Sequence, residues 1–188
     1  MGDKLNELWR IALDQHGYVT TRDAVDAGVN KVYLVQLARG AEVPVLHRVA
    51  HGVYRFAENR IPVDQWDPYM LATLWPAGRG VLCCDTALQL HELCDVNPDK
   101  IHVAVPATYR VRRDGGGPYA IHRVDLAPDQ LTCLEGIRIV TPVTAIEQGI
   151  AGHTPPHLLT QAIETVRARG LVPTDGLAHL QRRLNGTT

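Results

Sequence analysis

The stretch from residue 17 to residue 56, GYVTTRDAVDAGVNKVYLVQLARGAEVPVLHRVAHGVYRF, decides the fold of this chain. It begins with Gly17-Tyr18-Val19-Thr20-Thr21, which leads into a short helix. The turn residues Gly28-Val29-Asn30 end that helix, and the pattern predicts a second helix over roughly 31–39. Two helices joined by a tight turn are thereby indicated.

The stretch closes on a predicted hairpin. Residues 45–49 and 53–56 are rich in β-branched and aromatic side chains, and His51-Gly52 stands between them as the turn. An amphipathic helix precedes the whole stretch, with Leu5, Leu8, Trp9, Ala12 and Leu13 at helical spacing. Helix, helix, turn, helix and hairpin is the order of a winged helix-turn-helix, so we expect residues 1–60 to bind duplex DNA.

Local signals agree with these boundaries. Thr20 followed by Asp23 matches a capping box, with Asp in place of the usual Glu or Gln. Ala24 and Val25 are expected to face inward on the short helix. Gly28 stands where a helix end requires a positive φ, and Asn30 is a good N-cap for the next helix.

The helix at 31–39 is the expected recognition helix. Tyr33, Leu34 and Leu37 share one face, and the opposite face carries Lys31, Val32, Val35, Gln36 and Arg39. Lysine and arginine can contact phosphates or guanine edges, glutamine can pair with adenine, and valine can touch a thymine methyl group. The alternative is an ordinary solvated helix face.

The hairpin supplies the wing. Arg48, His51 and Arg55 are predicted on or near its exposed surface, where arginines can contact the DNA backbone or a minor groove. A plain hairpin that seals the core is compatible with the same pattern.

Composition limits the function. The chain has 188 residues, 45% hydrophobic and 21% charged, which is typical of a soluble globular protein. Its formal net charge of −1 argues against a nonspecific nucleic-acid binder, so DNA binding must come from a local basic patch. The sequence shows neither a secretion signal nor a membrane-spanning stretch, and we expect a cytoplasmic protein.

Residues 67–188 are predicted to form a second, α+β domain after a polar linker. Asp67 and Pro68 read as the N-cap and first residue of a helix, and strands are expected at 101–105, 119–124 and 137–140. Helices follow from about Pro142, Pro155 and Asp175. A loop over 107–118 combines Arg110, Arg112 and Arg113 with a triple glycine that lacks the features of a phosphate-binding motif.

No catalytic constellation is present in the sequence. Serine is absent, and no metalloprotease, nucleotide-binding or nuclease motif is found, so we expect neither an enzyme nor a cofactor. The four cysteines form no CxxC pair, and Cys83 and Cys84 read as reduced core residues, so no metal is expected. A zinc site remains an alternative, because His91 and His102 are close to these cysteines in sequence.

The chain resembles the AbiEi family of antitoxins from bacterial type IV toxin–antitoxin (abortive infection) systems. The resemblance covers about residues 5–150. Its N-terminal part rests on Gly17-Tyr18-Val19-Thr20-Thr21, Gly28-Val29-Asn30, Leu37-Ala38-Arg39-Gly40 and His47-Arg48-Val49-Ala50-His51-Gly52-Val53-Tyr54-Arg55, and its second part on Leu74-Trp75-Pro76, Ile101-His102-Val103-Ala104-Val105-Pro106 and Gly136-Ile137-Arg138-Ile139-Val140-Thr141-Pro142.

Two departures from the family pattern limit what is carried over. Ala41-Glu42-Val43-Pro44 lengthens the connection to the wing, and Thr144 stands where relatives often have arginine.

The resemblance implies a function. Such antitoxins bind inverted repeats in their own promoter and repress their operon, and their C-terminal domain counteracts a nucleotidyltransferase-like toxin without needing a stable complex with it. In this chain the basic loop with Arg110, Arg112 and Arg113 is the expected antitoxin surface. Two alternatives stay open: a winged-helix regulator whose second domain senses a ligand, and a nuclease with a DNA-targeting head.

Overall fold

The computed structural model describes residues 2–39, 44–112, 115–152 and 154–186, and these form two compact units. The first unit consists of Met1–Gly80 with the short segments Val111–Gly115 and Glu135–Ile137. The second consists of Val81–Arg110, Gly116–Leu134 and Arg138–Thr188. The helix at Asp67, which the sequence assigned to the second domain, therefore groups with the first unit.

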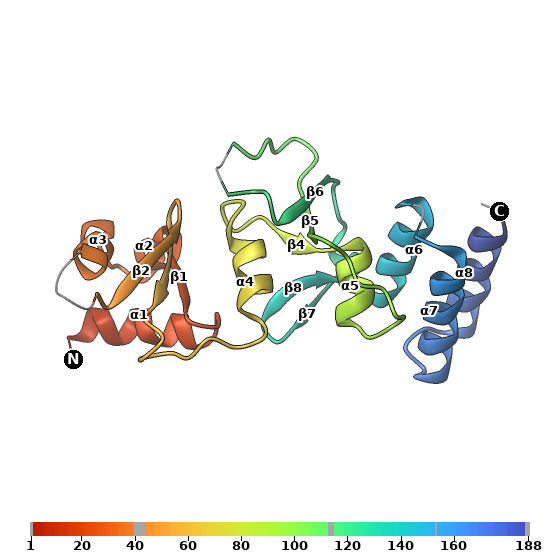
Figure 1. The fold of residues 1–188 in the computed structure, drawn as a ribbon, viewed down its shortest axis with the longest axis horizontal. Helices are drawn as coiled ribbons and strands as arrows, with labels where there is room; N and C mark the ends of the chain where they lie inside the picture. Colours follow the sequence, from red (N-terminus) through yellow and green to blue (C-terminus); the bar gives the residue numbers. More distant parts are fainter. Residues whose placement is uncertain (1, 40–43, 113–114, 153, 187–188) are drawn as a thin grey trace. The chain divides into compact units, whose positions relative to one another are not determined.

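The first unit contains the helices and strands expected for residues 1–60, followed by one more helix (Figure 1). They are α1 (Asp3–Leu13), β1 (Tyr18–Thr20), α2 (Thr21–Asp26), α3 (Lys31–Arg39), β2 (Leu46–Ala50), β3 (Val53–Phe56) and α4 (Asp67–Leu74). The strands form one sheet in the order β1-β3-β2, and both pairings are antiparallel. The predicted hairpin thus gains a third strand from Tyr18–Thr20.

The capping interactions that the sequence predicted at the helix boundaries are present in the structure. The Thr20 hydroxyl accepts a hydrogen bond from the Asp23 amide at 3.1 Å, and the Asp23 carboxylate accepts one from the Thr20 amide at 2.7 Å. Gly28 follows α2 with a φ of 69°. The Asn30 side chain accepts a hydrogen bond from the Val32 amide at 2.9 Å. The capping box, the glycine stop and the N-cap are therefore all confirmed.

The core of the first unit lies between its helices and its sheet. Leu8, Leu34 and Phe56 are fully buried, and the Trp9 ring meets the Phe56 ring edge-on with centroids 5.2 Å apart. Two residues expected to face inward do not: Leu13 is 57% exposed and Val25 is 56% exposed. Leu13 is the last residue of α1, and Val25 is the last but one of α2.

The second unit combines a five-stranded mixed sheet with four helices. Its elements are β4 (Val81–Leu82), α5 (Cys84–Leu90), β5 (Ile101–Val105), β6 (Tyr119–Arg123), a 3-10 turn (Pro128–Gln130), β7 (Leu131–Leu134), β8 (Ile137–Val140), α6 (Pro142–Gly152), α7 (Pro156–Ala168) and α8 (Thr174–Gly186). The strand order is β6-β5-β4-β8-β7. The strands β4 and β7 were not expected from the sequence.

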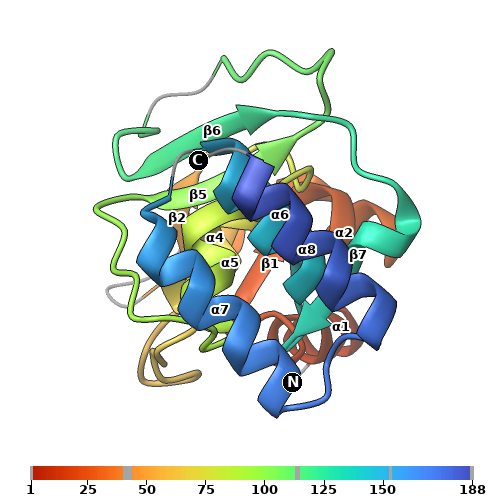
Figure 2. The same ribbon diagram turned by 90° about the vertical axis from the view of Figure 1, so that its right-hand side faces the viewer.

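Three of the helices described for the second unit, α6, α7 and α8, follow its last strand, as expected for an α+β arrangement, whereas α5 lies between β4 and β5. Figure 2 shows α6, α7 and α8 side by side, and each of the three packs against the other two. Ile146 of α6, Leu159 of α7 and Leu180 of α8 are at most 2% exposed. Over the described ranges, no helix is both long enough and apolar enough to cross a membrane.

Candidate nucleic-acid interface

The outer face of α3 is the face that the sequence predicted. Lys31, Gln36 and Arg39 are exposed, whereas Leu34 is fully buried. Val32, on the same outer face, is 57% exposed. The helix therefore offers two cations, one amide and one apolar side chain to solvent, which are the groups that can read the major groove of DNA.

The β2–β3 hairpin presents a second polar surface. Its register places Arg48 opposite Tyr54 and Ala50 opposite Val53, so Val49 is an extra residue in a β-bulge. The bulge interrupts the alternation of side chains along β2. Arg48 and the bulge residue Val49 are both exposed, as is His47 before them.

Arg48 and His51 lie together at the end of this hairpin. The Arg48 Nη2 atom is 3.4 Å from the His51 Nδ1 atom, and both residues are exposed. Among the ion pairs between described residues, none involves Lys31, Arg39 or Arg48. These three cations remain available to phosphates.

Arg55 does not belong to this surface, and the prediction that it lies on the exposed wing was wrong. The residue is only 6% exposed. Its Nε atom donates to Asp67 Oδ1 at 2.5 Å, and its Nη2 atom donates to Asp67 Oδ2 at 3.2 Å. All four residues of β3, the central strand of the sheet, are buried, so a side chain on either of its faces lies in the interior.

The rest of the Arg55 guanidinium is also satisfied. Its Nη1 atom donates to the Phe56 and Ile61 carbonyl oxygens, at 3.0 and 3.3 Å, and its Nη2 atom to the Pro62 carbonyl at 3.1 Å. Burial disfavours the charge, but the hydrogen bond and attraction to Asp67 outweigh it, so the pKa of Arg55 is raised. Arg55 therefore ties the hairpin to the segment after it.

Asp67 has a different role from the one that the sequence predicted. It was expected to cap α4, but the N-cap is Trp66 and Asp67 is the first helical residue. Its carboxylate is 5% exposed and serves as the counter-ion of Arg55. A carboxylate at the start of an apolar helix can pair with a cation, so the sequence did contain a signal for an ion pair at Asp67. No residue near Asp67 in the sequence identified Arg55 as the cation.

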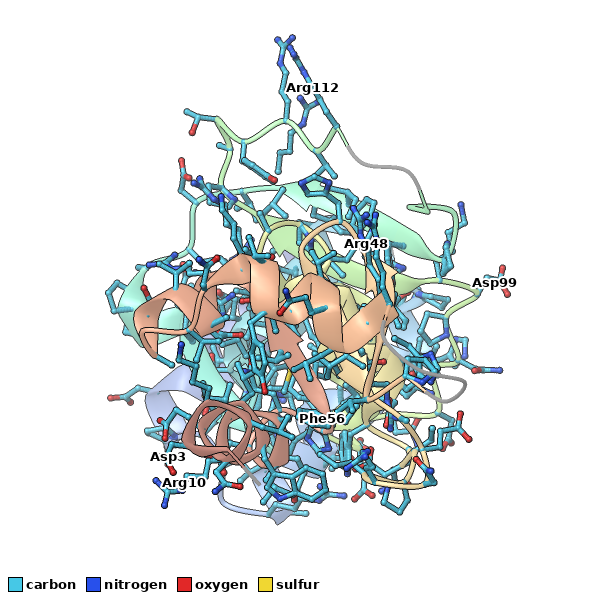
Figure 3. The ribbon with its side chains drawn as sticks, turned by 90° about the vertical axis from the view of Figure 1, so that its left-hand side faces the viewer. Asp3, Arg10, Arg48, Phe56, Asp99 and Arg112 are labelled. Atoms are coloured by element: carbon cyan, nitrogen blue, oxygen red, sulfur yellow. The ribbon has the colours of Figure 1, made fainter. Side chains whose placement is uncertain are left out.

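The structure describes two of the three arginines of the predicted antitoxin surface. Arg110 and Arg112 are exposed, and Figure 3 shows the Arg112 side chain extending away from the ribbon. Arg113 lies outside the described residues, as do residues 41–43 of the lengthened connection to the wing. The described part of the loop is therefore open to solvent, as the sequence predicted.

Of the two histidines in the zinc alternative, His102 lies beside the cysteine cluster but His91 does not. His91 does not join the cysteines: its Nε2 atom lies 2.8 Å from the Val140 carbonyl oxygen, and burial lowers its pKa. His122 takes its place instead, because its ligand nitrogen lies within 4.8 Å of the Cys83 and Cys84 sulfur atoms. The sequence missed this cluster because His122 is on a separate strand, β6.

A comparison with known families identifies the segment that carries the DNA-binding candidates. Residues 6–57 match the family model described as "Transcriptional regulator, AbiEi antitoxin". The AbiEi match runs from α1 to the end of β3 and so includes α3 and the hairpin. It confirms the resemblance seen in the sequence over these residues.

A solved structure extends the likeness to the whole fold. The crystal structure of the RV2827C protein from Mycobacterium tuberculosis has a TM-score of 0.57 to this chain at 17% identity. The likeness covers 100% of this chain and 76% of the other. At this identity it shows a shared fold. The comparison with curated proteins found no match.

Proposed function

We propose that this protein is a type IV antitoxin that represses its own operon. The observation that carries the proposal is the exposed face of α3, with Lys31, Gln36 and Arg39, inside the segment that matches the AbiEi family. In this proposal residues 1–60 are a winged helix-turn-helix that binds inverted repeats in its own promoter. The DNA target places its action in the cytoplasm.

The proposed reading of DNA divides the work between two elements. The helix α3 enters the major groove, where Gln36 pairs with an adenine edge and Val32 contacts a thymine methyl group. Lys31 and Arg39 neutralise phosphates at the ends of the helix. The hairpin contributes Arg48 and His51 to the adjacent backbone. Arg55 contributes indirectly, because its buried hydrogen bonds hold the hairpin to the segment after it.

The second part of the proposal concerns residues 67–188, which we infer to counteract a nucleotidyltransferase-like toxin. Within this range the second unit, which starts at Val81, has its own sheet and helices, as an independently acting domain requires. The exposed Arg110 and Arg112, together with Arg113, are the proposed antitoxin surface for an acidic or nucleic-acid partner. No enzymatic activity enters this proposal.

The DNA-binding part is tested by the fluorescence anisotropy of labelled promoter DNA. Replacing Lys31, Arg39 or Arg48 with alanine should weaken binding by about 1–3 kcal/mol where a base contact is lost, and less for a phosphate. Each lost phosphate contact should also reduce the salt slope by about one unit. Arg10→Ala is the control, since Arg10 is an exposed arginine on α1 that lies apart from Arg48 in Figure 3. If all three variants bind like wild type, the docking is refuted.

Gln36 should contribute specificity and little nonspecific affinity. The variant Gln36→Ala is expected to lose discrimination at one base position by about 1–3 kcal/mol, because a bidentate amide–adenine pair is removed. Binding should be compared on operator, single-base operator variants and random DNA. An equal loss on operator and random DNA would instead place Gln36 on the phosphate backbone.

The antitoxin part is tested by co-expression with a nucleotidyltransferase gene found beside this one. Residues 61–188 are expected to restore growth in part, whereas residues 1–60 should not. Rescue by residues 1–60 alone would overturn the division of labour. Arg110→Ala with Arg112→Ala in the full chain should weaken rescue without changing operator affinity.

A further inference from the structure

The second unit gathers two thiols and two imidazoles at one point, where β4 passes into α5. Cys83 follows β4 as the N-cap residue of α5 and is fully buried, and Cys84 is the first residue of α5. His102 lies on β5 and His122 on β6. All four residues belong to the second unit.

An unusual backbone turn brings the two cysteines to the same side. Consecutive side chains of an extended chain point to opposite faces. Cys84 instead has a φ of 49°, a conformation that costs about 1 kcal/mol or more for a residue with a Cβ atom. The Cys84 amide donates to the Gln148 Oε1 atom at 3.0 Å, which helps to hold the turn. Strained backbone that the surroundings maintain is found mostly at functional sites.

The sheet register brings the two histidines to the same place. The strands β5 and β6 are parallel, with His102 opposite Ala120 and His122 opposite Ala104. The period of two therefore puts both rings on one face, where they stack with centroids 5.0 Å apart. The His122 Nε2 atom is 3.2 Å from the His102 Nδ1 atom.

The spacing of these atoms fits a tetrahedral metal ion. The Cys83 and Cys84 sulfurs and a His122 nitrogen all lie within 4.8 Å of one another. Metal–ligand bonds of about 2.0–2.3 Å imply ligand–ligand spacings of roughly 3.3–3.8 Å in a tetrahedron. The two imidazole nitrogens, at 3.2 Å, are already close to this spacing.

We propose that Cys83, Cys84, His122 and His102 bind one Zn²⁺ ion in each chain. Two thiolates and two imidazoles are the ligand set that favours zinc over magnesium or calcium. The site lies among β4, β5, β6 and the start of α5, so the ion would join these elements. Cys84, His102 and His122 are only partly buried, which leaves a path for the ion to enter.

The electrostatics of the cluster prepare it for a cation. The Cys83 thiol hydrogen-bonds to Cys84, and His102 and His122 add further hydrogen bonds, which together outweigh burial and lower the pKa of Cys84 to about 3. The same thiol–thiolate contact, with burial, raises the pKa of Cys83. Zinc ligation requires both cysteines as thiolates and both imidazoles neutral, so Zn²⁺ binding would displace protons from the cluster.

The test uses the purified full-length protein after removal of metals. Zn²⁺ affinity and stoichiometry are measured by competition with a chromophoric chelator, and Co²⁺ is added separately to read the ligand set from its absorption. We expect one ion per chain, thiolate–cobalt charge-transfer bands and a rise in Tm with Zn²⁺. Cys84→Ser and His122→Gln should each reduce Zn²⁺ affinity by more than tenfold and weaken the cobalt bands.

The chain supplies its own controls. Cys94→Ser and Cys133→Ser remove cysteines that are not in the cluster, and His91→Gln removes a histidine bound to a backbone carbonyl; all three should bind Zn²⁺ like wild type. Circular dichroism identifies any variant that fails to fold, and His122→Gln, at a partly buried position, keeps the test decisive if Cys84→Ser does not fold.

Two results would overturn the proposal. One is Zn²⁺ affinity in Cys84→Ser equal to that of wild type. The other is a wild-type protein that binds no Zn²⁺ but whose Cys84 is alkylated much faster than Cys133, which would make the cluster a reactive thiolate rather than a metal site.

Discussion

Arg55 is a charged residue in the interior of the first unit. Its side chain and that of Asp67 are 8% and 6% exposed, and the two form a bidentate pair. Two charges removed from water are tolerated here because each has the other and because carbonyl oxygens take the remaining donors. The stability of the unit therefore depends on neither partner being removed alone.

We expect Arg55→Ala to lower the free energy of unfolding by about 3–5 kcal/mol, because it leaves the Asp67 carboxylate buried without a partner. The double variant Arg55→Met with Asp67→Leu should lose much less, since no charge is left uncompensated. Denaturant unfolding measures both. A single variant that is as stable as wild type would show that the pair is solvated.

His16 gives the first unit a dependence on pH. Its Nδ1 atom is 2.8 Å from Asp64 Oδ2. Burial lowers the pKa of His16, but the hydrogen bond and attraction to Asp64 outweigh it and leave the pKa above 6.5. Burial raises the pKa of Asp64, but its hydrogen bonds to His16 and to the Trp66 amide outweigh it and leave it below 3.8.

The direction in which stability changes with pH follows from the raised pKa of His16. The raised pKa of His16 means that its contribution is complete below pH 6.5 and is lost as the pH rises through the folded-state pKa. We expect wild-type stability to fall over this range more steeply than that of His16→Asn, a variant that tolerates the φ of 49° at this position. Urea unfolding at a series of pH values measures it. Parallel curves for the two proteins would contradict the ion pair.

At the scale of the element, the β2–β3 hairpin depends on its turn. Gly52 has a φ of 71°, and a Cβ atom there would come within 3.3 Å of the Thr21 Oγ1 atom. Gly28 has a similar φ of 69° at the end of α2, but a Cβ atom there would meet no neighbour within 4 Å. Backbone strain from the positive φ is common to both positions, whereas a close contact arises only at Gly52. Comparing substitutions at the two glycines therefore distinguishes backbone strain from a change in the hairpin.

Gly52→Ala should destabilise the first unit by about 1 kcal/mol or more and also weaken operator binding, because the hairpin that carries Arg48 must shift. Gly28→Ala is the matched control: it should cost about 1 kcal/mol of stability, from the positive φ alone, and leave operator affinity unchanged. Thermal unfolding and anisotropy measure the two effects. Equal affinity of both variants would remove the hairpin from the interface.

At the scale of the whole molecule, the first unit continues beyond residue 60. Asp67 pairs with Arg55, and α4 packs against β1. A fragment that ends at residue 60 therefore buries Arg55 without its counter-ion. The sequence suggested a boundary in the polar linker because composition marks exposed segments, but composition cannot show that a residue beyond the linker returns to the core.

We expect a fragment of residues 1–80 to unfold cooperatively and to be more stable than residues 1–60 by several kcal/mol, since breaking a buried ion pair costs about 3–5 kcal/mol. Chemical denaturation followed by far-UV circular dichroism measures both fragments. If residues 1–60 are equally stable, the pair contributes nothing and α4 is dispensable.

Much of the first unit could be predicted from the sequence. The capping box at Thr20, the glycine after α2 and the β-branched and aromatic residues of 53–56 are local signals, because each depends on residues within a few positions. The same holds for the outer face of α3, where the helical period alone separates Lys31 and Gln36 from Leu34.

The tertiary structure alone decided which charged and polar groups meet. Arg55 follows the hairpin pattern, yet its burial depends on Asp67 beyond the linker; Cys84 and His122 meet because β4, β5 and β6 are neighbours in the sheet. Local sequence sets the backbone dihedral preferences and the spacing of apolar residues, and these two properties determine each helix or strand. Which elements become neighbours is set by burying apolar faces together, and that balance is a property of the whole chain.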